Sequence, residues 1–194
     1  MVTGILSAVQ SQNGGVTVER RMPRMDFVIE SGNRLWGCRY GENSSGETVN
    51  EIYASKLGDF KNWSCYMGIS TDSYTASVGT DGPFTGAVNF LGYPMFFKER
   101  CVHKVFGRYP ASFQIQDTPC RGVQAGCHGS LAIVGETLFY KARSGICAFD
   151  GSLPVEVSQA LGSETYSHAV GGALNNAYRG NKGESCLFLQ LGDT

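Results

Sequence analysis

The chain contains 194 residues, of which 42% are hydrophobic, 17% are charged and 26 are glycine. A low charged fraction with many glycines favours a turn-rich all-β protein over a helical one. The formal net charge of −1 provides no basic field that would attract nucleic acid or anionic lipid. The longest apolar stretches are far shorter than the roughly 20 residues needed to span a bilayer, and the first 15 residues show no secretory signal. We therefore expect neither a membrane nor a nucleic-acid partner.

Three similar segments follow one another along the chain. Each contains a short apolar strand, a turn with glycine, an apolar and aromatic strand, a hairpin and a third strand. The copies cover residues 26–38 with 51–55, residues 86–98 with 101–106, and residues 130–141 with 145–149. The dipeptides Gly32-Asn33, Gly92-Tyr93 and Gly135-Glu136 take equivalent turn positions in this alignment, because a two-residue hairpin requires positive φ there.

The repeat predicts the fold class and the domain organisation. Leu35, Met95 and Leu138 are separated by 60 and 43 residues, and the shorter spacing suits a four-stranded propeller blade of about 40–50 residues. We expect antiparallel β-propeller-like blades, three complete and one fragment, over residues 16–174, with an N-terminal segment at 1–15. Residues 175–194 are expected to form a polar tail or a truncated blade.

This number of blades is too small for a closed propeller, which usually has at least four. A fourth copy begins at residues 168–174 but does not complete its strands. The sequence leaves three interpretations open: a piece of a longer propeller, closure by oligomerisation, or sheets packed as an irregular sandwich.

Each copy is expected to close with one more extended segment. These segments are residues 60–65, 111–116 and 153–158. The last one alternates, with Leu153, Val155 and Val157 on one face and more polar residues on the other. This alternation is typical of a half-buried outer strand.

The seven cysteines and three histidines do not form a recognisable site. There is no C-x-x-C pair, and Cys101 with His103 is among the few spacings that resemble metal ligands. We interpret most cysteines as small apolar residues of the sheet core, reduced as in a cytosol. His103, His128 and His168 are isolated in the sequence, so we predict no catalytic, metal or cofactor role for them.

Aromatic residues recur at matching strand positions and are predicted to pack between blades. They are Trp36, Phe96, Phe97, Phe139 and Tyr140. Burial of each would contribute on the order of 2–3 kcal/mol; an aromatic platform for sugar stacking is the alternative. Trp63 and Tyr66 fall near a loop, where they are either exposed contacts for a ligand or partner, or anchors at a blade edge.

Three aspartates stand next to glycine at predicted turns. These are Asp59, Asp81 and Asp150, whose carboxylates would cap backbone N–H groups. Asp81 is also a candidate ligand or partner contact, because only residues 72–81 have the density of oxygen-bearing side chains that a calcium loop requires. The turn interpretation is the simpler one, and we predict no bound metal or cofactor.

The chain contains three motifs in an order that resembles the order found in a known protein family. The motifs are RLWG (34–37) followed by IYASKLGD (52–59) and NW (62–63), GYPMFFKE (92–99) with VHKVFG (102–107), and SGICAFDG (144–151). At these residues the chain resembles structural proteins of tailed bacteriophages and prophages, head–tail connector or tail-associated, that are built from β-propeller blades. The resemblance covers roughly residues 16–170.

This resemblance implies a virion component that is assembled in the cytoplasm of the bacterial host. Its partners would be other virion proteins or copies of itself, and its role would be that of a protein–protein interaction scaffold. The alternative function is a carbohydrate-binding propeller module for receptor recognition. A propeller glycosidase is a third possibility, but that chemistry needs two carboxylates about 5–10 Å apart, and the repeats do not bring such a pair together.

Overall fold

The computed structural model describes residues 8–10, 16–18, 22–43 and 45–158. Within these ranges the chain forms strands and two short 3₁₀ turns, without an α-helix. No described segment has the length and hydropathy of a helix that could cross a membrane. The chain divides into two compact units: the first comprises residues 1–83 and 105–116, and the second comprises residues 84–104 and 117–194.

The first unit contains a four-stranded antiparallel sheet whose strands follow chain order. Its strands are β3 (Phe27–Ser31), β4 (Arg34–Glu42), β5 (Thr48–Ala54) and β6 (Tyr74–Ser77). The β3–β4 hairpin closes with Ser31 opposite Arg34, so Gly32 and Asn33 form the two-residue turn with φ of 61° and 59°. A separate two-stranded sheet pairs β1 (Ala8–Gln10) with β2 (Val16–Val18).

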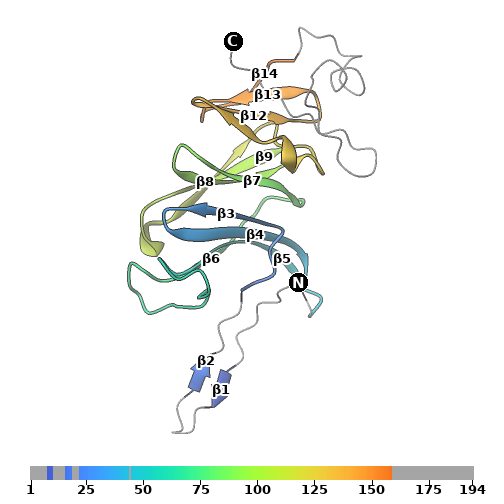
Figure 1. The fold of residues 1–194 in the computed structure, drawn as a ribbon. Helices are drawn as coiled ribbons and strands as arrows, with labels where there is room; N and C mark the ends of the chain where they lie inside the picture. Colours follow the sequence, from blue (N-terminus) through green and yellow to red (C-terminus); the bar gives the residue numbers. More distant parts are fainter. Residues whose placement is uncertain (1–7, 11–15, 19–21, 44, 159–194) are drawn as a thin grey trace. The chain divides into compact units, whose positions relative to one another are not determined.

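The second and third sheets repeat this organisation (Figure 1). The second contains β7 (Phe84–Phe90), β8 (Tyr93–Lys98), β9 (Cys101–Phe106) and β10 (Gln114–Pro119), with a 3₁₀ turn at Pro110–Ser112. The third contains β11 (Ala132–Val134), β12 (Thr137–Lys141), β13 (Ile146–Phe149) and β14 (Val155–Glu156), preceded by a 3₁₀ turn at His128–Ser130. The boundary between the two units falls within β9 and within β10.

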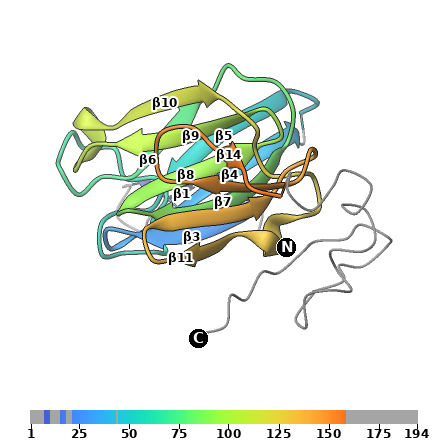
Figure 2. The same cartoon turned by 90° about the horizontal axis from the view of Figure 1, so that it is seen from above.

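The core of the second unit lies between β7–β9 and the third sheet. It contains Phe90, Met95, Phe97, Val102, Val123, Cys127, Leu138, Tyr140, Ala142, Cys147 and Phe149. Rings from the two sheets meet directly, because the centroids of Phe97 and Tyr140 are 5.3 Å apart and those of Phe90 and Phe149 are 5.9 Å apart. Seen from above, the labelled strands of this unit run in similar directions, as in face-to-face sheet packing (Figure 2).

The prediction of an all-β chain with repeated antiparallel sheets is confirmed. Of the five predicted core aromatics, Trp36, Phe96, Phe97 and Tyr140 are buried, whereas Phe139 is half-buried. The expected domain boundary at residue 174, the fourth copy from 168 and the tail at 175–194 lie outside the described residues.

One predicted turn is displaced by a residue. The second hairpin pairs Phe90 with Tyr93, so its central residues are Leu91 and Gly92, both with positive φ (51° and 78°), and not Gly92 and Tyr93. The alignment of the three copies placed their glycines at the same turn position. In the second hairpin, however, glycine is the second turn residue, and Leu91 adopts the left-handed conformation at the first. Because of this shift, the equivalent of Met95 is Trp36 in the first sheet and Phe139 in the third.

The prediction for the fourth strand is wrong in the first sheet. Residues 60–65 belong to a loop, and β6 at Tyr74–Ser77 is the outer strand instead. In the other two sheets the outer strands begin later than predicted, at Gln114 and Val155. The physical reason for the first error is a set of buried polar contacts that hold residues 55–73 as a long loop.

Candidate functional site

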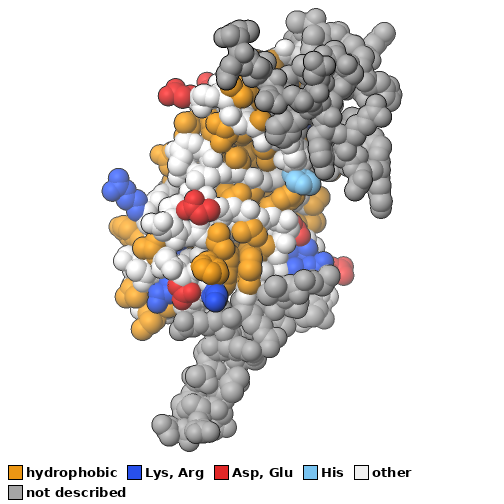
Figure 3. Space-filling view, viewed as in Figure 1, with side chains coloured by type: hydrophobic (Ala, Val, Ile, Leu, Met, Phe, Trp, Pro, Cys, Tyr) orange, Lys and Arg blue, Asp and Glu red, His pale blue; other side chains and the backbone are white. Residues whose placement is uncertain are grey.

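The connection between β5 and β6, residues 55–73, exposes several large apolar side chains. Their exposed fractions are 39% for Leu57, 59% for Phe60, 60% for Tyr66, 76% for Met67 and 50% for Ile69. We call Tyr66, Met67 and Ile69 the loop tip. Hydrophobic side chains also reach the surface elsewhere on the face drawn in Figure 3, with charged residues between them. Apolar residues gathered on one loop mark an interaction surface more strongly than isolated ones do.

Asp72 fixes the conformation of the loop tip. Its side chain is buried, and its Oδ2 accepts hydrogen bonds from the backbone N–H groups of Met67 (2.6 Å), Gly68 (2.6 Å) and Ile69 (3.1 Å). The thiol of Cys65 donates to Oδ1 at 3.4 Å. Burial alone would raise the pKa of Asp72, but these hydrogen bonds outweigh it and hold the pKa below its usual value. The ionised carboxylate therefore caps three successive backbone donors.

Arg34, at the start of β4, ties the ends of the same loop together. Its Nη1 donates to the carbonyls of Ser55 (2.7 Å) and Asp72 (2.5 Å), and its Nη2 donates to the carbonyl of Ser70 (2.9 Å). The guanidinium carbon also lies 5.5 Å from the ring centroid of Phe113. Burial lowers the pKa of Arg34, and the charge of Asp72 opposes this shift. The loop therefore has a fixed conformation although it contains no regular strand.

Trp63 and Tyr66, both predicted as contact candidates, have different environments. Trp63 is 4% exposed, and its Nε1 donates to the carbonyl of Phe60 at 2.7 Å, so it anchors the loop. The ring of Tyr66 is exposed, while its hydroxyl lies 3.3 Å from the carbonyl of Trp63 and 3.0 Å from Oγ1 of Thr75. Tyr66 thus presents a ring in a defined orientation.

Asp81, the third candidate, lies apart from the loop tip in the chain, in the segment that follows β6. It is exposed, and Gly82 next to it has φ of 86°, as expected for a turn. Asp150 is the clearest turn cap, because its Oδ1 accepts from both the N–H and the hydroxyl of Ser152, and these bonds lower the pKa of Asp150. Within the described ranges, no three His, Cys, Asp or Glu side chains converge as a metal site requires.

A surface pocket of about 510 Å³ lies beside the β5–β6 loop. Its lining residues are Glu30, Asn33, Arg34, Leu35, Leu57, Gly58 and Phe60. Oε1 of Glu30 accepts from the backbone N–H of Asn33 at 3.1 Å, which orients the carboxylate at the hairpin turn. The pocket therefore combines apolar side chains with a carboxylate and an amide.

The cysteines fit the prediction of apolar core residues. Cys38, Cys65, Cys101, Cys127 and Cys147 are buried and Cys120 is half-buried; Cys186 lies outside the described residues. Burial is the main reason that the pKa of the Cys120 thiol is raised to about 11, so this thiol is protonated at neutral pH. His103 is 1% exposed, with Nδ1 3.3 Å from the carbonyl of Phe96, whereas His128 is exposed.

Two central residues of the site were not recognised from the sequence. In the sequence, Arg34 is one of several arginines near the first hairpin, and Asp72 is only the first residue of the segment with the oxygen density of a calcium loop. Their partners are mainly backbone groups, which have no residue-specific signature. The one available signal was Arg34 itself, a charged residue that begins an apolar strand directly after a two-residue turn.

No protein-family model matches the chain, and no curated protein matches it.

Proposed function

We propose that this protein is a β-propeller-type assembly scaffold that binds a protein partner through its loop tip. The observation that carries the proposal is the run of three successive four-stranded antiparallel sheets, each in chain order, which is the organisation of propeller blades. The core of the second unit, formed between two such sheets, supports blade-on-blade packing.

The loop tip supports protein binding because it combines exposed apolar area with a fixed backbone. Tyr and Met are enriched in protein interfaces, and a pre-organised loop loses little conformational entropy when it binds. The partner is a virion protein or a second copy of the chain, and the resemblance to tailed-phage structural proteins is what favours a particle assembled in a bacterial cytoplasm.

The proposal is tested by incorporation into particles. A tagged chain is expressed during particle production in its host, and particles purified on a density gradient are quantified by mass spectrometry. The double variant Met67→Glu/Ile69→Glu is expected to lose incorporation by at least about tenfold, since each charge must be desolvated at an apolar interface. Val28→Glu, at an exposed apolar position on β3 (42%, against 76% for Met67 and 50% for Ile69), is the control. Absence of the wild-type chain from particles, or equal incorporation of the double variant, would contradict the proposal.

A carbohydrate-binding role is the second candidate, and the pocket beside the loop favours it. An exposed Phe60 ring next to the carboxylate of Glu30 and the turn of Asn33 offers stacking and hydrogen bonding to one sugar ring. Titration with a panel of monosaccharides and oligosaccharides, followed by nuclear magnetic resonance, tests it. Shifts confined to these residues and abolished by Phe60→Ala would support sugar binding, and an unchanged spectrum for every sugar would exclude this candidate.

A further inference from the structure

Strand β6 is the last strand of the first sheet, and within the described part of the chain no strand pairs with its outer edge. The N–H of Val78 donates to the carbonyl of Asn50 at 2.9 Å, in register with the β5–β6 ladder. Hydrogen-bonded and non-hydrogen-bonded pairs alternate along an antiparallel ladder. Alternate residues therefore direct their backbone groups away from β5, toward the open edge. We call them the edge residues: Thr75, Ser77 and Gly79.

The edge residues are accessible to another strand. All three are exposed, and their backbone groups have no hydrogen bond within the ranges that the structure describes. The open edge begins at Thr75, because the N–H of Ser73 already donates to the carbonyl of Cys65 at 2.9 Å. It continues past β6, because Nδ2 of Asn50 donates to the carbonyls of residues 78 and 80 and keeps this segment beside β5. Unpaired backbone groups along such an edge are a template for strand addition.

The outer strands of the other two sheets carry features that protect an edge from pairing. Charged residues, proline and a short strand all have this effect. Strand β10 contains Asp117 and Pro119, and β14 has two residues, follows Pro154 and contains Glu156. Residues 73–80, in contrast, include neither a charged residue nor proline. Of the three outer strands, β6 is therefore the one that its sequence leaves open to pairing.

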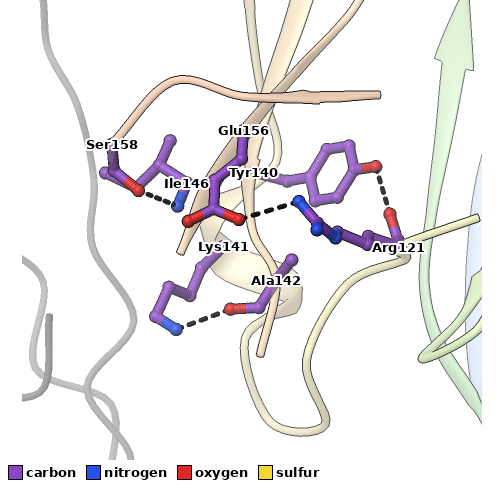
Figure 4. A network of polar contacts seen from close by, with 7 residues as sticks. All are labelled: Arg121, Tyr140, Lys141, Ala142, Ile146, Glu156 and Ser158. Carbon is purple, nitrogen blue, oxygen red and sulfur yellow. Dashed lines mark hydrogen bonds and ion pairs between the residues drawn. The ribbon is translucent and has the colours of Figure 1, made fainter. Parts of the chain in front are cut away.

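Side-chain contacts also fix β14 against its own sheet. Glu156, with its side chain 8% exposed, accepts from Nη1 of Arg121 at 2.8 Å, and Oγ of Ser158 accepts from the N–H of Ile146 at 2.8 Å (Figure 4). Because these polar side chains are held inward, Val155 points outward and is 65% exposed. The alternation predicted for this strand is present, but its orientation is the reverse of the expected one.

We infer that two copies of this chain associate by antiparallel pairing of β6 with β6, about a two-fold axis at Ser77. Ser77 of one copy then lies opposite Ser77 of the other, and Thr75 lies opposite Gly79. Each of these pairs can exchange both of its N–H···O bonds, because the edge residues all direct their backbone groups outward. No charge on residues 73–80 opposes the approach. A two-fold contact occupies both open edges, so association ends at a dimer.

The side chains along the edge fit this register. The hydroxyl of Tyr66 lies 3.0 Å from Oγ1 of Thr75, so a large ring lies next to this end of the edge. The register sets Gly79 of the second copy opposite Thr75, and glycine adds no side chain there. The space where a Cβ of Gly79 would be is open. At the axis two serines meet, and hydroxyl side chains form favourable cross-strand pairs.

This inference concerns the edge of β6 rather than the loop tip, so it stands whether or not the loop tip binds a virion protein. Complementary charges at Ser77 test it in the full chain. Ser77→Lys and Ser77→Glu each place two like charges directly opposite each other at the axis, which opposes pairing, whereas an equimolar mixture places lysine opposite glutamate. The matched control is Ser45→Lys, at an exposed serine of the β4–β5 hairpin. Circular dichroism confirms that each variant retains the β-sheet signal of the wild type.

Sedimentation equilibrium over a concentration series measures the association. The wild type and Ser45→Lys are expected to form the same dimer. Each charged variant at Ser77 is expected to raise the dimer Kd by at least about tenfold, and the mixture to bind at least about tenfold more tightly than either variant alone. Amide exchange at Thr75 and Ser77 should slow as the wild-type dimer forms.

A wild-type chain that stays monomeric would overturn the inference, and so would a dimer that the charged variants do not weaken. A mixture that binds no more tightly than the single variants would also overturn it. Slow amide exchange at Thr75 and Ser77 in a monomer would assign the edge to a segment of the same chain instead. Oligomers that grow beyond a dimer would contradict the two-fold contact.

Discussion

Replacing Arg34 by methionine tests whether the buried guanidinium organises the β5–β6 loop. The change removes three hydrogen bonds to backbone carbonyls, at 2.7, 2.5 and 2.9 Å. Each bond to a charged group contributes about 1.5–3 kcal/mol. The exposed Ser70 regains a water molecule, and methionine keeps the apolar stem near Phe113. The two buried carbonyls, of Ser55 and Asp72, lose their donors, so we expect the unfolding free energy to fall by about 3 kcal/mol.

Urea denaturation followed by tryptophan fluorescence measures this loss, because both tryptophans of the chain, Trp36 and Trp63, lie in the first unit. Hydrogen exchange of the loop-tip amides should accelerate in parallel. The matched control is Lys61→Met, which replaces an exposed cation of the same loop, beside the ring of Phe60, and should cost about 1 kcal/mol or less. If Arg34→Met shifts the midpoint no more than this control and leaves amide exchange unchanged, the guanidinium does not organise the loop.

Three further predictions concern the second unit. Leu91→Asn should raise the unfolding free energy by up to about 1 kcal/mol in urea denaturation, because asparagine tolerates the positive φ of this turn better than leucine does; a loss of stability would contradict the assignment of a left-handed turn residue. Gly122→Ala should lower the thermal midpoint, since a Cβ would collide with the carbonyl of Lys98, whereas Gly129→Ala, with open space around it, should not. Burial lowers the pKa of His103 below 6.5, so its contribution to stability is present above about pH 6.5 and falls as the pH decreases toward the folded pKa. The unfolding free energy measured between pH 8 and 5 should show this decrease, His103→Gln should remove it, and an equal slope in both proteins would assign the decrease to other groups.

Local patterns predicted most of the β-structure, because hairpins are encoded by neighbouring residues. Gly32-Asn33 and Gly135-Glu136 are turns as predicted, while Leu91 adopted a conformation that its residue type disfavours. The loop at residues 55–73 could not be predicted from the sequence. Arg34 binds backbone carbonyls that are distant in the sequence, and Asp72 binds backbone N–H groups, which every residue type except proline has.

The orientation of the outer strand β14 could not be predicted from its own sequence either. Alternation identified the two faces of residues 153–158 correctly but not which one points inward. Arg121 and Ile146 decide this by binding Glu156 and Ser158, and neither contact follows from the strand's own sequence. Of the candidate contact residues, Tyr66 is exposed and Trp63 is buried, because the loop turns one ring inward as its anchor.

The charges of Arg34 and Asp72 are satisfied by main-chain groups of the loop rather than by side chains of the loop tip. The conformation of the loop tip is therefore independent of the side chains at Met67 and Ile69. These two positions can change in size, polarity or charge while the backbone that carries them keeps its shape. The loop is thus a site where a new binding specificity could be introduced by substitution at the tip alone, without a cost to the stability of the sheet below it.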